Sequence, residues 1–157
     1  MTSPEKRVSG PKPPPECDSV SILLADDAAV LRRNVRKLMS NTGITLEIHE
    51  AESVCDTLCY LRRYSTDLLI LDLQFPDGTG FDVLKHISVL EVRPLVVVLT
   101  NFPSEVNHVR ARELGADYFL DKSYEYEQVL SILEKLCLAR SAGQQPKNKV
   151  IQARRQG

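Results

Sequence analysis

Short apolar runs, separated by longer amphipathic stretches, constrain the fold of this chain more than any other feature. Each run has the length of a β-strand, and the stretches between them repeat apolar residues at helical spacing. The expected strands are residues 20–25, 44–48, 68–71, 95–99 and 116–120, and the expected helices are residues 30–39, 54–61, 81–90, 104–115 and 129–137. This alternation predicts an α/β fold, a single doubly wound, five-stranded parallel sheet flanked by five helices.

The apolar runs also indicate where strands lie in the sheet. Residues 68–71 and 95–99 are apolar throughout, which is typical of strands covered on both faces. Ile44, Leu46 and Ile48 alternate with polar residues, which favours a strand at the sheet edge. Because ligands of such sheets bind beyond the carboxyl ends of the strands, function is expected directly after each strand.

The composition changes at both ends of the chain, and this predicts the limits of the folded domain. Five of the nine prolines fall within the first fifteen residues, so we expect residues 1–18 to be a disordered, proline-rich arm. Residues 139–157 carry basic side chains and no acidic one, so we expect a basic disordered tail. Residues 19–138 are then expected to form one domain.

Charge and composition exclude several classes of protein. The net charge of −1 gives no general attraction to nucleic acid or an anionic membrane. No apolar stretch approaches the roughly 20 residues of a membrane span, and no secretion signal opens the sequence. Without CxxC spacing, Cys17, Cys55, Cys59 and Cys137 are expected to be reduced thiols in the cytoplasm. Cys55 and Cys59 can share a helix face, where we expect buried apolar residues rather than metal ligands.

Polar residues follow the expected strands at the predicted carboxyl edge. Asp26 and Asp27 follow the first strand, and Asp72, Thr100 and Lys122 follow three others. Three carboxylates brought together repel one another unless a cation neutralises them, and Mg²⁺ is the divalent ion that suits oxygen ligands. With the ammonium of Lys122 and the hydroxyl of Thr100 opposite the metal, the set describes a pocket for a phosphoryl group. Taken singly, Asp27 could be a helix N-cap, Thr100 could cap a turn and Lys122 could lie on the surface.

Motifs of common enzymes are missing from the sequence. There is no GxGxxG, GxxxxGK[ST] or GxSxG. Asp72-Leu73-Gln74 lacks the second aspartate of the DxD motif of haloacid-dehalogenase-type phosphatases. The three histidines have no plausible nucleophile to pair with. We therefore expect no enzyme, although a small phosphatase using Asp72 stays open.

Over residues 20–138 the sequence resembles the receiver domain of two-component response regulators. The resemblance rests on the acidic pair Asp26-Asp27, the run LDLQFPDGTG at residues 71–80, Thr100, and Phe119 three residues before Lys122. It implies the flavodoxin-like strand order 2-1-3-4-5.

The resemblance also implies a role for each site residue. Asp72 would take a phosphoryl group from a sensor histidine kinase or a histidine phosphotransfer protein. Mg²⁺ would be bound by Asp72, by Asp27 directly, by Asp26 mainly through water, and by the backbone carbonyl of Gln74. Lys122 would pair with a phosphoryl oxygen.

A conformational switch is implied as well. Thr100 would hydrogen-bond the phosphoryl group and let Phe119 turn inward, which alters the surface of the fourth helix, fifth strand and fifth helix. A core phenylalanine in a buried strand is the alternative interpretation of Phe119. In physical terms, phosphorylation would bias a two-state element by a local change of charge.

Three residues depart from the family pattern. Ser123 follows Lys122, where most members have a proline with a cis bond, so the placement of the lysine is in question. Asn101 stands where many members have alanine or glycine. Gln74 occupies a position whose side chain tends to tune phosphoryl lifetime in the family.

The function expected from the sequence is a stand-alone receiver that signals by protein contact or phosphorelay. The residues after 138 are too few and too polar for a DNA-binding module, unless this sequence is part of a longer protein. A downstream protein partner is implied, and a phosphorylation-linked dimer is open. The main alternative is a pseudo-receiver that binds proteins without phosphorylation.

Overall fold

The computed structural model describes residues 19–141. Its main sheet has five parallel strands in the order β2-β1-β3-β6-β7. They are β1 (Val20–Ala25), β2 (Leu46–Ala51), β3 (Leu68–Leu71), β6 (Leu95–Thr100) and β7 (Tyr118–Asp121). Counted along the chain within this sheet, the order is 2-1-3-4-5, so the predicted fold is confirmed.

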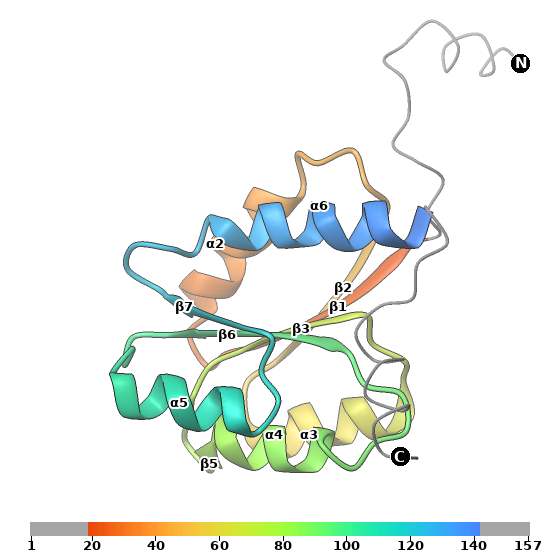
Figure 1. Ribbon diagram of the computed structural model, residues 1–157. Helices are drawn as coiled ribbons and strands as arrows, with labels where there is room; N and C mark the ends of the chain where they lie inside the picture. Colours follow the sequence, from red (N-terminus) through yellow and green to blue (C-terminus); the bar gives the residue numbers. More distant parts are fainter. Residues whose placement is uncertain (1–18, 142–157) are drawn as a thin grey trace, which may run out of the picture.

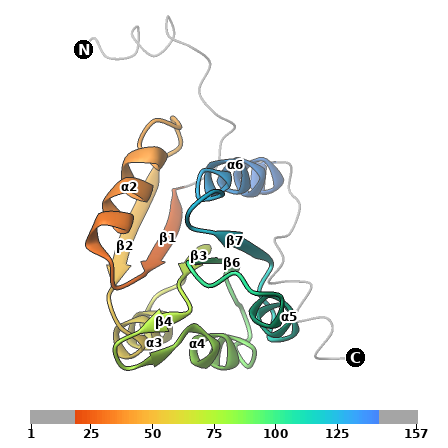
Figure 2. The ribbon, with the colours of Figure 1, turned by 90° about the vertical axis from the view of Figure 1, so that its left-hand side faces the viewer.

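Helices cover both faces of the sheet. They are α2 (Ala29–Met39), α3 (Val54–Arg63), α4 (Gly80–Ile87), α5 (Glu105–Glu113) and α6 (Gln128–Ser141). Helices α2 and α6 lie on one face, and α3, α4 and α5 lie on the other (Figure 1, Figure 2). Helix α4 ends earlier than residue 90, and α6 continues past the domain boundary expected at residue 138.

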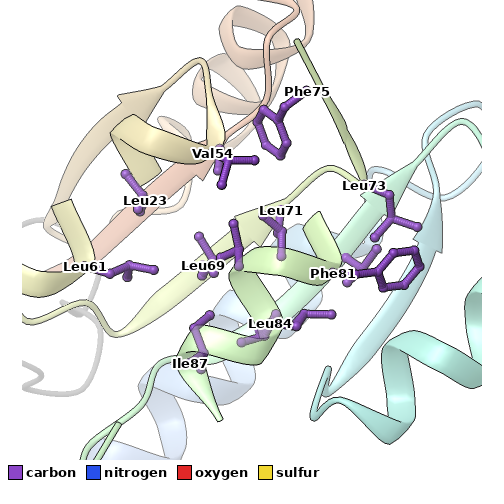
Figure 3. Packing of buried hydrophobic residues seen from close by; sticks show 14 of the residues in the cluster. Leu23, Val54, Leu61, Leu69, Leu71, Leu73, Phe75, Phe81, Leu84 and Ile87 are labelled. Carbon is purple, nitrogen blue, oxygen red and sulfur yellow. The ribbon is translucent and has the colours of Figure 1, made fainter. Parts of the chain in front are cut away.

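Each face of the sheet has its own apolar core, because side chains alternate between the two faces along a strand. On the face of α3, α4 and α5, Leu69 and Leu71 of β3 pack against Phe81 and Ile87 of α4 (Figure 3). Both strand leucines are fully buried. Burial of such a side chain contributes roughly 1.5–3 kcal/mol, so β3 is firmly held between the two helical layers.

A small hairpin that the sequence analysis did not predict lies between β3 and α4. Its strands are β4 (Gln74–Phe75) and β5 (Gly78–Thr79), which pair in antiparallel fashion. Strands of two residues are too short to show a hydrophobic period. The hairpin matters because it belongs to the loop that follows Asp72.

The prediction for two cysteines was wrong. Cys55 and Cys59 are exposed, because the buried stripe of α3 runs through Val54, Thr57 and Leu61 instead. Cys137 is buried in α6.

Some predictions fall outside the described residues. They are Cys17, the arm at residues 1–18 and the tail beyond residue 141. Within residues 19–141, no helix is long and apolar enough to cross a membrane.

Candidate functional site

Three carboxylates meet at the carboxyl edge of the sheet. Asp26 and Asp27 follow β1, and Asp72 follows β3, whose last residue Leu71 pairs with Ala25. One oxygen from each carboxylate lies within 4.8 Å of the others. Asp26 and Asp72 are buried, whereas Asp27 is exposed. The pairing of β1 with β3 therefore brings the acidic residues together, as the strand ends predicted.

Lys122 follows the edge strand β7, and its side chain reaches this cluster. Its Nζ lies 2.6 Å from Asp26 Oδ2 and 3.1 Å from Asp72 Oδ2. Only 9% of the lysine side chain is exposed. The interpretation of Lys122 as a surface residue is therefore wrong, and its ammonium group balances part of the acidic charge.

The ionisable side chains in this site shift one another's pKa. Burial raises the pKa of Asp72, and repulsion from Asp26 adds to it, while Lys122 and the amide of Leu73 act in the opposite direction. Burial alone would lower the pKa of Lys122, but its contacts with Asp26 and Asp72 outweigh burial and hold that pKa above its ordinary value. The ammonium therefore stays charged beside a carboxylate that is costly to ionise.

Backbone contacts hold the turn that carries the acidic pair. Asp26 Oδ1 accepts a hydrogen bond from the amide of Ala28 at 2.8 Å. The guanidinium of Arg32 donates to the carbonyl of Asp26 at 2.6 Å. The N-cap residue of α2 is Ala28. The interpretation of Asp27 as a helix N-cap is therefore wrong.

Thr100 is fully buried at the end of β6. Its hydroxyl oxygen accepts a hydrogen bond from the amide of Phe102 at 3.0 Å, so Thr100 does cap the turn that follows. Its carbonyl accepts from the amide of Lys122 at 2.9 Å. Thr100 thus lies beside the backbone of Lys122, and its contact with a phosphoryl group stays a prediction.

Phe119 lies on β7, partly buried against the core. Its ring stacks on that of His108, with centroids 4.7 Å apart and planes 10° from parallel. Both rings line a surface hollow of about 460 Å³. The ring is thus at the protein surface rather than deep in the core, and its inward turn stays a prediction.

Two residues that do not stand out in the sequence shape the loop after Asp72. The carboxylate of Asp77 accepts hydrogen bonds from the amides of Val54 and Cys55, at 2.8 and 3.0 Å, and so ties the hairpin to the start of α3. Gly80 packs so closely on the backbone that a Cβ there would overlap the carbonyl oxygen of Asp72. Both residues lie in the run at residues 71–80, and this was the one feature of the sequence that could have indicated them.

The donor set at this edge fits a hard divalent cation. Its ligands are carboxylate oxygens, and the single ammonium of Lys122 stands against the two buried carboxylates of Asp26 and Asp72. Oxygen ligands of this kind suit Mg²⁺. Gln74 lies two residues after Asp72 in β4, and the part played by its carbonyl stays a prediction.

Comparison with known proteins points to one family. The family model described as the response regulator receiver domain matches residues 22–134. The chemotaxis protein CheY of Bacillus subtilis is 25% identical over 114 residues, 73% of this chain and 94% of CheY. The transcriptional regulatory protein CpxR of Escherichia coli K12 is 33% identical over 111 residues, 70% of this chain and 46% of CpxR.

The fold is shared with solved structures as well. The non-phosphorylated HemR receiver domain from Leptospira biflexa superposes with a TM-score of 0.67 at 27% identity, covering 76% of this chain and 94% of that domain. The chain spans about half the length of the first curated relatives that it matches.

Proposed function

Because the chain belongs to the response regulator receiver family, we propose that it accepts a phosphoryl group on Asp72 and signals by protein contact. The observation that carries this proposal is the buried Asp72 carboxylate, 3.1 Å from the ammonium of Lys122 and within 4.8 Å of two further carboxylates. Charges of both signs lie together there around two buried carboxylates, which suits electrostatic stabilisation of a transferred phosphoryl group.

The proposed donor is the phosphohistidine of a histidine kinase or phosphotransfer protein. A carboxylate oxygen of Asp72 attacks phosphorus, so a P–O bond forms while the P–N bond to the imidazole breaks. The imidazole leaves with the electron pair and takes up a proton. Phosphoaspartate is the product, and its hydrolysis by water returns the carboxylate and inorganic phosphate.

Residues of this chain have separate parts in that step. We propose that the ammonium of Lys122, 3.1 Å from Asp72 Oδ2, pairs with a phosphoryl oxygen. Thr100 supplies the hydroxyl that we propose bonds a second oxygen. Asp26, Asp27, Asp72 and the carbonyl of Gln74 would hold Mg²⁺, which when bound neutralises charge that develops on the phosphoryl oxygens.

We further propose that the face of α5, β7 and α6 binds the downstream partner. Several apolar side chains in and beside α5 and before α6 are exposed, and such residues are typical of contact surfaces. They are Phe102, Val106, Val109 and Tyr124. We also propose that the protein acts as a stand-alone receiver in the cytoplasm and does not turn over external substrates.

Intact mass tests the proposal directly, and the lack of tryptophan makes mass more convenient than fluorescence. Wild-type protein, incubated with acetyl phosphate and Mg²⁺, should gain one phosphoryl group, whereas Asp72→Ala should gain none. Asp56→Ala, an exposed aspartate on α3, serves as the matched control and should behave as wild type.

If the wild type gains nothing, beryllofluoride binding by ¹⁹F NMR separates two explanations. Binding would mean that the site is competent but does not react with this small donor. Failure of both assays would favour the pseudo-receiver that binds proteins without phosphorylation.

A further inference from the structure

The turn after β7 holds Lys122 in place although the residue after it is Ser123 rather than proline. The described residues contain no cis peptide bond. Lys122 nevertheless reaches both Asp26 and Asp72. Other contacts must therefore set the path of this turn.

Two acidic side chains make those contacts. Asp121 Oδ1 accepts a hydrogen bond from the amide of Ser123 at 2.8 Å. Glu125 Oε1 accepts from the amide of Asp121, also at 2.8 Å. The carbonyl of Asp121 in turn accepts from the amide of Glu125 at 2.8 Å. The amides on either side of Lys122 are thus each bound by a carboxylate.

The amide of Lys122 itself is also bound. It donates to the carbonyl of Thr100 at 2.9 Å, which extends the pairing of β6 with β7 by one residue. Three successive amides, of residues 121, 122 and 123, therefore have acceptors at 2.8–2.9 Å. Hydrogen bonds from amides to carboxylates are stronger than those between neutral groups, so this backbone is held firmly.

Firm backbone placement matters because the side chain of Lys122 is long. A lysine ordered by burial loses about 2 kcal/mol of rotamer freedom, so a mobile backbone would make its position still more costly to keep. Asp121 and Glu125 are half-buried and line the same hollow as Phe119. Their carboxylates bind the turn rather than the phosphoryl pocket.

We propose that Asp121 and Glu125 are positioning residues that hold Lys122 against Asp26 and Asp72, in the place of a proline turn. This inference deepens the proposed function and rests on it for its meaning in catalysis. It also predicts how Lys122 is held in the unphosphorylated protein, and this can be tested without any phosphorylation assay.

The first test is the reactivity of the Lys122 amine. Brief acetylation with acetic anhydride, read by peptide mass spectrometry against exposed Lys85 of the same molecule, should be slow in the wild type because Lys122 is buried. In Asp121→Ala the ratio of Lys122 acetylation to Lys85 acetylation should rise about tenfold, as when one hydrogen bond to a charged group is lost. Glu127→Ala, which removes an exposed carboxylate two residues beyond Glu125, should leave the ratio unchanged.

The second test is the rate of phosphorylation by acetyl phosphate. Asp121→Ala should be about tenfold slower than wild type, and Asp121→Asn, which keeps the acceptor, should recover most of the rate. In a Lys122→Met background Asp121→Ala should cause no further loss, since Asp121 acts through the lysine.

The outcomes separate this inference from the proposed function. Wild-type protein that never gains a phosphoryl group would contradict the function, while the acetylation ratio would still decide the positioning. If Asp121→Ala does not fold, Glu125→Ala replaces it, with a raised ratio expected because Glu125 accepts from the amide of Asp121. Folded Asp121→Ala or Glu125→Ala proteins with wild-type ratios would overturn the inference.

Discussion

Gly80 shows how a single residue can limit the geometry of the phosphorylation loop. Its amide donates to the carbonyl of Leu73 at 3.0 Å, which closes the base of the hairpin. A Cβ at this position would overlap the carbonyl oxygen of Asp72 and crowd Leu73 Cα. Glycine is required here by close approach of two backbones, whereas Gly43 is favoured by its positive φ of 78°.

We expect Gly80→Ala to lower both stability and phosphorylation. Because the loop must shift to admit the methyl group, unfolding in urea should show a loss of about 1–3 kcal/mol, typical of overpacking. Asp72 should also be phosphorylated more slowly, measured by intact mass. Gly43→Ala is the control: it strains a remote turn with open space around it, so it should cost stability without slowing phosphorylation. A normal rate in Gly80→Ala would contradict the close-approach argument.

At the scale of elements, a cluster of charges joins α2 to the edge strand β2. Glu50 of β2 accepts from Arg32 at 2.6 Å and from Arg36 at 2.9 Å. Arg36 also donates to the backbone carbonyl of Ile48. The same Arg32 holds the carbonyl of Asp26, so the packing of α2 on β2 is coupled to the turn that carries the acidic pair.

This cluster predicts a pH-dependent contribution to stability. Hydrogen bonds from Arg36 and then Arg32 hold the pKa of Glu50 below its ordinary value of 4.5. A carboxyl whose pKa is lowered by folding adds stability above the pKa of the unfolded chain, and that stability is lost as pH falls through the lowered value. Glu50→Gln should therefore cost about 1 kcal/mol near neutral pH and progressively less in acid, since Glu50 is partly exposed.

Urea unfolding of the wild type and of Glu50→Gln, from neutral pH into acid, measures the difference between their free energies of unfolding. Added salt should reduce it, because exposed pairs are screened. Glu47→Gln, on the other face of the same strand, is a suitable control because the ion pairs of Arg32 and Arg36 described here do not involve Glu47. A difference that stays constant from neutral pH into acid would show that the ion pairs are not its source.

At the scale of the whole molecule, the acidic edge is a source of instability that a cation can relieve. Asp26 and Asp72 are buried close to each other, and Lys122 compensates only part of their charge. A ligand that binds only the folded protein stabilises it in proportion to the logarithm of its concentration. The metal site and global stability are therefore linked.

Mg²⁺ is expected to raise the thermal unfolding midpoint, and a chelator should reverse the rise. At a concentration 100 times its dissociation constant the stabilisation should be about 2.7 kcal/mol. Asp27→Asn should abolish the rise with little effect on the metal-free midpoint, because Asp27 is exposed. Sodium chloride at matched ionic strength is the control. An equal rise with sodium chloride would mean general screening rather than a site.

Comparison of sequence and structure shows which features are local. The strands and helices follow from apolar spacing, and Gly43 and Gly115, which follow α2 and α5, have positive φ. Ser104 is the N-cap of α5, and its hydroxyl oxygen accepts from the amide of Asn107. These features depend on a few consecutive residues, so the sequence alone can indicate them.

The sequence by itself determined the alternation of strands and helices and the set of polar residues at the carboxyl edge of the sheet, and its resemblance to the receiver family implied the strand order. Only the tertiary structure decided that Lys122 lies between Asp26 and Asp72, that Cys55 and Cys59 face outward, and that Asp121 and Glu125 bind the turn. The physical reason is that a residue's strand-end position follows from chain pattern, whereas a contact between side chains depends on strand register and rotamers set by distant parts of the chain.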